Sequence, residues 1–424
     1  MDNLEKAKRY IAKQKLLGMD NIVIRINQDN SIEVIRYRNS APDKQTGFLE
    51  IEIPDFVTCI REELFKDFKQ NIKLVYRGNS IDDTSKLFSG YKGKRIDLSE
   101  FNMTLVCNMK EMFKGSENLV DINFGHNCNA LNTDMSHMFE DCMYLRKIDM
   151  SSFNTSSVTN MAFMFDGCRS LKELGISNFN TQRVTNMENM FAWCVSMKEI
   201  DLSSFNTGRV KNMEYMFNGC ESLKRLDLSS FDTGRVTSMR NMFYNCYELE
   251  ELNLSSFDVQ RVKNMVQMFY NCTKLEELDL SSFVTKNVID MRYMFDSCES
   301  LKRLDLSSFD THKVASMSWM FQDCRSIEEI DLSSFDTQNV EDMTGMFYCC
   351  RVLQRLDINH FDTQNVDDMR RMFYGCESLD KLDMDGFKVS ELPLDNMFVG
   401  CYSLNKVHIG GSEVRVSEYT PWKV

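Results

Sequence analysis

A 26-residue period is the feature that most constrains what this chain can fold into. One repeat, residues 223–248, reads LKRLDLSSFDTGRVTSMRNMFYNCYE, and the next, residues 249–274, reads LEELNLSSFDVQRVKNMVQMFYNCTK. The Met-Phe pair of this repeat recurs with its phenylalanine at Phe113, Phe139, Phe165, Phe191, Phe217, Phe243, Phe269, Phe295, Phe321, Phe347, Phe373 and Phe398. A period of this length indicates a solenoid, in which each repeat packs only on its neighbours, instead of the two or three globular domains that 424 residues would otherwise suggest.

Two periodicities follow each other within a repeat. Leucines alternate with polar residues over residues 226–229, which predicts a half-buried strand. Asp232 and Thr233 then carry the side-chain oxygens of a helix N-cap, and the apolar residues between 236 and 246 fall on one helical face. We therefore expect an α/β solenoid of leucine-rich-repeat type, with a parallel β-sheet on one face, short helices on the other and about twelve full repeats.

The ends of the chain depart from the period, as terminal repeats of solenoids do. Residues 1–47 predict a non-repeat N-terminal cap made of an amphipathic helix and a β-hairpin. Residues 48–95 hold degenerate repeats, residues 96–408 hold the regular leucine-rich-like repeats, and residues 409–424 form a C-terminal cap. Curvature and handedness do not follow from the spacing.

The repeat motif L-x-x-L-D-L-S-S-F-[DN]-T-x-x-V-x-x-M-x-x-M-F-x-x-C closely resembles that of the BspA-like leucine-rich-repeat proteins of bacteria. The resemblance covers about residues 95–408, and residues 51–65 look like a second repeat flavour of the same family. It implies a leucine-rich-repeat solenoid and a surface protein that binds host matrix or other cells. Residues 1–47 match no pattern of that family.

Eleven of the 15 cysteines take part in the same periodicity. They are Cys142, Cys168, Cys194, Cys220, Cys246, Cys272, Cys298, Cys324, Cys350, Cys376 and Cys401. A cysteine that recurs once per repeat is a packing position, so we interpret these residues as small buried thiols and not as halves of disulfides. The methionines of the repeat receive the same interpretation.

An acidic column is the main candidate for a binding surface. The polar position between the two strand leucines is aspartate in most repeats, and we select as partner-binding candidates Asp201, Asp227, Asp279, Asp305, Asp331 and Asp357. Stacked carboxylates about 5 Å apart repel each other, so the column could serve as a strip for a basic protein segment or for cations. The alternative is a structural position of the repeat, whose charge the mixed-sign neighbouring column partly neutralises.

No catalytic constellation is found in the sequence. The five histidines form no metal-binding pair, no C-x-x-C motif occurs, and a near-uniform repeat offers little that is unique. We predict no enzyme activity, no catalytic residue, no cofactor and no metal. A net charge of −13 argues against nucleic acid as a partner, because phosphate binding depends on clustered lysine and arginine.

The expected function is protein binding or scaffolding through the solenoid surface, with the concave strand face as the predicted site. Two alternatives remain open: a surface-displayed, adhesin-like structural protein, and an enzyme or effector activity in residues 1–95. The sequence as it stands, with early charges and no long apolar run, predicts a cytoplasmic protein without membrane insertion, whereas the family resemblance implies the cell surface. The oligomeric state cannot be predicted from these residues.

Overall fold

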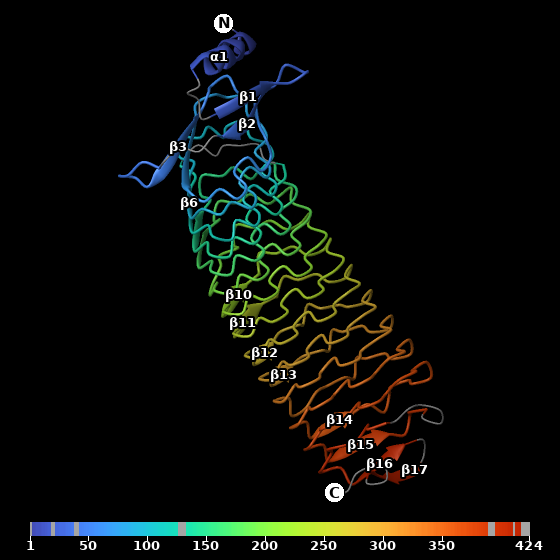
Figure 1. Ribbon diagram of the computed structural model, residues 1–424. Coiled ribbons are helices and arrows are strands. Elements are labelled where there is room, and N and C mark those ends of the chain that lie inside the picture. The colour runs from blue at the N-terminus through green and yellow to red at the C-terminus, as the bar shows by residue number, and fades with distance from the viewer. Residues whose placement is uncertain are drawn as a thin grey trace. The chain divides into compact units, whose positions relative to one another are not determined.

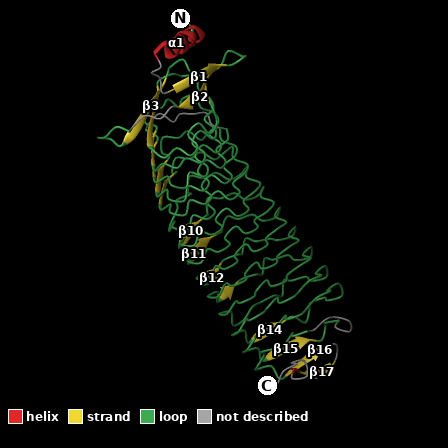
Figure 2. Cartoon of the chain, in the orientation of Figure 1, coloured by secondary structure: helices red, strands yellow, loops and turns green. Residues whose placement is uncertain are grey.

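The computed structural model describes residues 2–17, 22–37, 42–125, 133–388, 395–409 and 412–416. The chain divides into two compact units, an N-terminal unit of Met1–Asn206 and a C-terminal unit of Thr207–Val424, and each is described by itself. Among the described residues the structure has one helix, α1 (Asn3–Leu17). Figure 2 shows that strands and loops make up the remaining described chain.

The N-terminal unit begins with α1, followed by an antiparallel hairpin of β1 (Ile22–Ile26) and β2 (Ile32–Tyr37). β2 then pairs in parallel with β4 (Cys59–Ile60). A four-stranded parallel sheet follows in the order β3-β5-β6-β7, and β8 pairs with β9. The bounds are β3 (Phe48–Ile53), β5 (Asn71–Tyr76), β6 (Arg95–Asp97), β7 (Asp121–Asn123), β8 (Lys147–Asp149) and β9 (Glu173–Gly175).

Most coils of the C-terminal unit contain one short strand, where a coil is one repeat of the solenoid, and the coil between β13 and β14 has an isolated bridge from Glu329 to Arg355 instead. The parallel pairs β10-β11 and β12-β13 follow one another in chain order (Figure 1), and β14, β15 and β16 pair in parallel before β17 turns back antiparallel. The bounds are β10 (Arg225–Asp227), β11 (Glu251–Asn253), β12 (Glu277–Leu278), β13 (Arg303–Leu304), β14 (Arg355–Asp357), β15 (Lys381–Met384), β16 (Lys406–Ile409) and β17 (Ser412–Arg415). Equivalent residues lie in register, as Arg225 opposite Glu251 shows.

The prediction of a short helix in every repeat is wrong. Over the stretch that was expected to be helical, Asn241 and Asn245 have φ angles of 56° and 58°, in the left-handed region. The backbone N–H of Asn241 donates to the carbonyl of Val266 at 3.0 Å, so the hydrogen bond runs to the next coil and not along a helix. The fold is therefore a β-solenoid. The apolar residues have a helical spacing because the side chains at the turns, or corners, of each coil point into the interior.

The Asp-Thr pair also has another role than the predicted N-cap. Thr233 is buried, and its Oγ1 donates to the carbonyl of Asp258 at 2.9 Å and accepts from the N–H of Asp258 at 2.8 Å. Asp232 Oδ1 accepts from the N–H of Gly234 at 3.0 Å. The threonine hydroxyls that donate to the next coil in this way are those of Thr155, Thr181, Thr207, Thr233, Thr285, Thr311 and Thr337. This position thus joins successive coils.

Stacked phenylalanines fill the interior of both units. Phe65 stacks on Phe88 at 5.0 Å, and Phe88 stacks on Phe113 at 5.4 Å, so the degenerate repeats continue the same column. In the C-terminal unit the column runs without a break from Phe217 to Phe398. The chain accordingly forms about 14 coils, more than the twelve full repeats that the sequence predicts.

The periodic cysteines are free and buried, as predicted. Ten of these eleven thiols donate to the carbonyl of a phenylalanine in the preceding coil, for example Cys272 to Phe243 at 3.3 Å. Burial raises the pKa of Cys272 well above its ordinary value, which keeps the sulfur protonated and unreactive. Cys128 lies outside the described residues.

Candidate functional site

The strand face of the C-terminal unit has two charged rims and an apolar floor. In β10, Arg225 and Asp227 are exposed, whereas Leu226 between them is 3% exposed. The acidic rim consists of Asp227, Asn253, Asp279, Asp305, Asp331, Asp357 and Asp383. The mixed rim consists of Arg225, Glu251, Glu277, Arg303, Glu329, Arg355 and Lys381. The side chains between the rims form the floor.

Two adjoining hollows make this face a groove over its last coils. One, of about 890 Å³, is lined by residues that include Arg303, Leu304 and Asp305. The other, of about 900 Å³, is lined by residues that include Leu356 and His408. The two hollows share Glu329 and Asp331 as lining residues, so we treat them as one surface, the strand-face groove.

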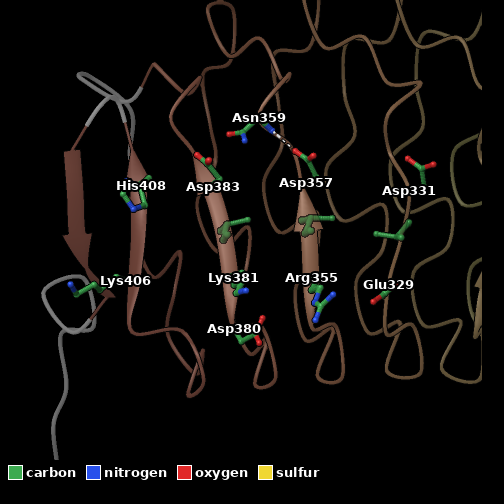
Figure 3. A pocket seen from close by; sticks show the side chains of 13 residues that line it. Glu329, Asp331, Arg355, Asp357, Asn359, Asp380, Lys381, Asp383, Lys406 and His408 are labelled. Carbon is green, nitrogen blue, oxygen red and sulfur yellow. Dashed lines mark hydrogen bonds between the residues drawn. The ribbon is translucent and has the colours of Figure 1, made fainter.

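Figure 3 shows how the rims lie in the second hollow. Asp331, Asp357 and Asp383 follow one another along one side, and Glu329, Arg355 and Lys381 follow one another along the other. Ile330, Leu356 and Leu382 lie between them, and Leu356 and Leu382 are 6% and 5% exposed. A bound segment would therefore meet carboxylates on one side, Glu329 and two cations on the other, and hydrocarbon beneath.

Backbone hydrogen bonds orient the carboxylates of the acidic rim. Asp305 Oδ1 accepts from the N–H of Ser307 at 2.9 Å, and Asp331 Oδ1 accepts from the N–H of Ser333 at 2.9 Å. The hydrogen bonds from these serines hold the pKa values of Asp305 and Asp331 below the ordinary range. Asp357 makes the same contact with the N–H of Asn359 at 3.3 Å. Each carboxylate thus accepts a backbone hydrogen bond at the end of its strand through one oxygen. Its second oxygen takes no part in this hydrogen bond.

The mixed rim changes character along the C-terminal unit. In its earlier coils opposite charges pair across coils: Arg225 with Glu251 at 3.2 Å, and Arg303 with Glu277 at 3.2 Å. Among the residues that the structure describes, no ion pair is found for Arg355 or Lys381. These two cations lie opposite each other in neighbouring strands, so the rim is positive at these two coils.

The six predicted residues are divided between the two units. Asp201 belongs to the N-terminal unit, where its Oδ1 accepts from the N–H of Ser203 at 3.0 Å. Asp227 and Asp279 lie on the strand face of the C-terminal unit but do not line the groove, whereas Asp305, Asp331 and Asp357 do.

Reasoning from the sequence missed the cations opposite these carboxylates. The sequence does contain a signal for these cations, because the neighbouring column holds two basic residues in succession, Arg355 and Lys381. From the sequence alone, we interpret that column only as one of mixed sign. The succession of like charges would have identified the coils at which the rim is no longer neutral.

Within the described parts of the chain, no three His, Cys, Asp or Glu side chains are grouped so that they could hold a metal ion. The one described helix is not of the length and apolar composition needed to cross a membrane.

Comparison of the sequence with family models gives two matches. The family described as Mycoplasma protein of unknown function, DUF285, matches residues 133–251, 220–329 and 295–412, which together make up more than half of the chain. The chain belongs to this family. The model of the BspA type leucine rich repeat region matches residues 43–172 and confirms the resemblance seen in the repeats. No curated protein sequence matches the chain.

Several solved leucine-rich-repeat structures are similar at low identity. A leucine rich cell surface protein from Faecalibacterium prausnitzii A2-165 is 16% identical, with 96% of this chain and 97% of that chain covered and a TM-score of 0.43. A leucine-rich repeat protein from Bacteroides ovatus ATCC 8483 is 18% identical, with 92% and 93% covered and a TM-score of 0.44. The pneumococcal vaccine antigen PcpA is 14% identical, with 76% and 82% covered and a TM-score of 0.37.

Proposed function

We propose that this protein is a non-enzymatic binding module that holds an extended segment of a partner protein in the strand-face groove. The observation that carries the proposal is the groove itself, with an apolar floor between a row of carboxylates and the cations Arg355 and Lys381. Its lining combines charged, polar and apolar side chains, an arrangement suited to the recognition of a partner segment.

The dimensions of the groove fit a short extended peptide. Its lining runs over five coils, from Arg303 to His408. At about 4.8 Å per coil this is a span of about 19 Å, which about six residues of extended chain would cover. Because hydrogen bonds between coils fix the rims before binding, little conformational entropy is lost on the side of this protein.

The charges favour a partner segment with basic and acidic side chains on opposite edges. Successive residues of an extended chain point to opposite sides, so lysines or arginines could face Asp305, Asp331 and Asp357 while carboxylates face Arg355 and Lys381. The net charge of −13 would also speed the approach of a basic partner. Asp227 and Asp279 would extend the acidic rim, and Asp201 would not take part.

Selection from a random peptide display library tests the proposal. Peptides enriched on the full chain should bind the triple variant Asp305→Asn, Asp331→Asn, Asp357→Asn at least about tenfold more weakly than the wild type, because charge pairs at an interface contribute to affinity.

The matched control is the triple variant Asp97→Asn, Asp149→Asn, Asp201→Asn, which changes the same repeat position in the N-terminal unit. We expect its affinity to stay within about twofold of the wild type. Equal losses in both variants, or no enrichment of peptides at all, would refute binding in the groove.

A further inference from the structure

A second ladder of backbone hydrogen bonds runs along the C-terminal unit, through the residue that follows the buried valine of each coil. The N–H of Thr237 donates to the carbonyl of Lys211 at 3.1 Å, and the same bond recurs from coil to coil up to Asp367 and Glu341, at 2.7 Å. This column, here called the lateral strip, consists of Lys211, Thr237, Lys263, Ile289, Ala315, Glu341 and Asp367. Equivalent side chains are therefore aligned and one coil, about 4.8 Å, apart.

The side chains of the lateral strip face the solvent. In the coil of Ile289, Val288 and Met291 are fully buried, whereas Ile289 is 50% exposed. The other members of the strip are exposed as well, except Ala315, which is partly exposed. The strip is thus an outer surface whose backbone is fixed by hydrogen bonds between coils.

The charges of the lateral strip are segregated by sign. Lys211 and Lys263 lie toward one end, Glu341 and Asp367 lie at the other, and the apolar Ile289 stands between them with Ala315. Within the described parts of the chain, no ion pair is found for any of these four charged side chains. By contrast, Asp290, the residue after Ile289, pairs with Arg292 at 2.6 Å. The strip therefore presents two uncompensated cations and two uncompensated carboxylates.

Three arginines strengthen the basic end of the lateral strip. The residue before the buried valine is an exposed arginine in the first three coils, at Arg209, Arg235 and Arg261. The nearby Asp232 and Asp258 bind their own turns, since each accepts a backbone N–H through Oδ1, at 3.0 Å and 2.9 Å. At the acidic end the positions equivalent to these arginines are asparagines, at residues 339 and 365.

We propose that the lateral strip is a self-association surface, on which two copies of this chain pack side by side and antiparallel about a two-fold axis. In such an interface every contact occurs twice. An axis between Ile289 and Ala315 places Ile289 of one copy against Ala315 of the second copy, and Lys263 opposite Glu341. Lys211 lies one coil beyond the position opposite Asp367, a distance of about 4.8 Å that its long side chain can span.

The order of the residues favours a second copy over an unrelated partner. A basic partner would match only the acidic end, and an acidic partner would match only the basic end. The strip in reversed direction supplies both, with an apolar residue in the middle, and a parallel alignment would place like charges opposite each other. None of the strip residues lines the strand-face groove, so the proposal does not depend on the proposed function.

The length of the strip predicts a weak dimer. Six steps of about 4.8 Å give a contact about 29 Å long and one column wide, which is smaller than a standard protein interface. We therefore expect a dissociation constant of about 10–100 µM in about 50 mM salt, and weaker association in about 500 mM salt, because salt screens exposed charges.

Sedimentation velocity of the full chain over a range of concentrations tests the proposal, with charge reversal as the main variable. The double variant Lys211→Glu, Lys263→Glu makes all four charges of the strip negative, and Glu341→Lys, Asp367→Lys makes all four positive. Each variant alone should associate at least about tenfold more weakly than the wild type, since like charges then face each other.

An equimolar mixture of the two double variants should restore dimers, with a dissociation constant within about threefold of the wild-type value. In the mixed dimer every reversed charge faces a complementary one, so attraction returns at both ends. Restored association also shows that both variants are folded. Ile289→Ser should weaken association by about threefold to tenfold, because it removes the apolar centre of the contact.

The matched control is the double variant Lys274→Glu, Lys388→Glu, which changes the net charge by the same amount at two exposed positions of the C-terminal unit outside the strip. It should stay within about twofold of the wild type. A wild type that is monomeric at about 200 µM in low salt, on the scale set by the expected affinity, would overturn the proposal. The same holds for an equal loss in the control, or for a mixture that associates no better than its components.

Discussion

The interior of the C-terminal unit and its surface rows differ in how strictly they repeat. In the interior, every coil from Phe217 to Phe398 places a phenylalanine in the same stack, and the buried thiols and threonines recur with it. On the surface, single coils depart from the pattern: Gly345 stands where the preceding coils have Tyr293 and Trp319, and Arg355 and Lys381 place two cations side by side. Regular positions hold the coils together, whereas departures create the places at which a ligand could be recognised.

The largest effect should follow a change in the interior. Phe269 is fully buried and stacks on Phe243 and Phe295, each at 5.6 Å. Phe269→Ala should lower the free energy of unfolding by about 3–5 kcal/mol, measured by urea denaturation, because it leaves a cavity in the stack. Tyr270→Ala, in the adjacent surface row, is the control. A loss below about 1 kcal/mol for Phe269→Ala would mean that the stack does not support the fold.

A buried carboxyl group in the C-terminal unit should make the free energy of unfolding depend on pH. Asp296 stands where Tyr244 and Tyr270 stand in earlier coils, and it is 2% exposed. Burial is the main cause that raises its pKa to about 7, the hydrogen bond from Ser297 opposes this, and the charge of Asp323 adds to it.

The direction of the pH dependence follows from the proton that Asp296 retains in the folded state. Between about pH 4 and pH 7 the unfolded carboxyl is ionised while the folded one stays protonated, so stability should fall as the pH rises through this range and level off above it. Asp296→Asn should reduce this slope and stabilise the protein at pH 8 by about 2–4 kcal/mol, measured by denaturation at several pH values. Burial also raises the pKa of Asp166 to about 7, so a part of the slope should remain in this variant. Identical pH profiles for both proteins would contradict the raised pKa.

The threonines that join successive coils should contribute less to the free energy of unfolding than the phenylalanine stack. Thr285 Oγ1 donates to the carbonyl of Asp310 at 2.9 Å and accepts from the N–H of Asp310 at 3.0 Å. Thr285→Val should cost about 1–3 kcal/mol in the free energy of unfolding, because it leaves two backbone groups of the next coil without a partner. Thr285→Ser keeps the hydroxyl and should cost less. The reverse order would assign the effect to the methyl group.

The smallest stability effect belongs to the mixed rim. Arg355→Gln and Arg303→Gln should each change the free energy of unfolding by less than about 0.5 kcal/mol, since both side chains are exposed. The affinity for an acid-containing peptide should fall about threefold to tenfold for Arg355→Gln and less for Arg303→Gln, whose charge Glu277 already compensates. Equal losses in peptide affinity would show that the difference between these coils has no role in binding.

Much of the fold could be predicted from the repeat, because a strand leucine, a phenylalanine and a cysteine recurred at fixed intervals and proved to be buried in register. The helices could not be excluded, because corners that all point inward give the same spacing as one helical face. Asparagine tolerates a positive φ, so Asn241 and Asn245 carried a weak signal against a helix, but Tyr215 and Trp319 at equivalent corners carried none.

The candidate site was predictable only in part. The aspartates were visible as a column, but their hydrogen bonds to the backbone of the strand end, and the division of the column between two units, depend on the folded chain. The charges of the lateral strip were equally visible, but their alignment in one column depends on the hydrogen bonds between coils.

Photocrosslinking tests the central claim, binding in the strand-face groove, most directly. Benzoylphenylalanine would replace Asn359 in the groove, Ser229 at the same exposed position of an earlier coil, or Ser151 at that position in the N-terminal unit. With a display-selected peptide, we expect a strong adduct from position 359, a weaker one or none from position 229, and none from position 151. Adducts of equal yield at positions 359 and 151, or at position 151 alone, would contradict the account.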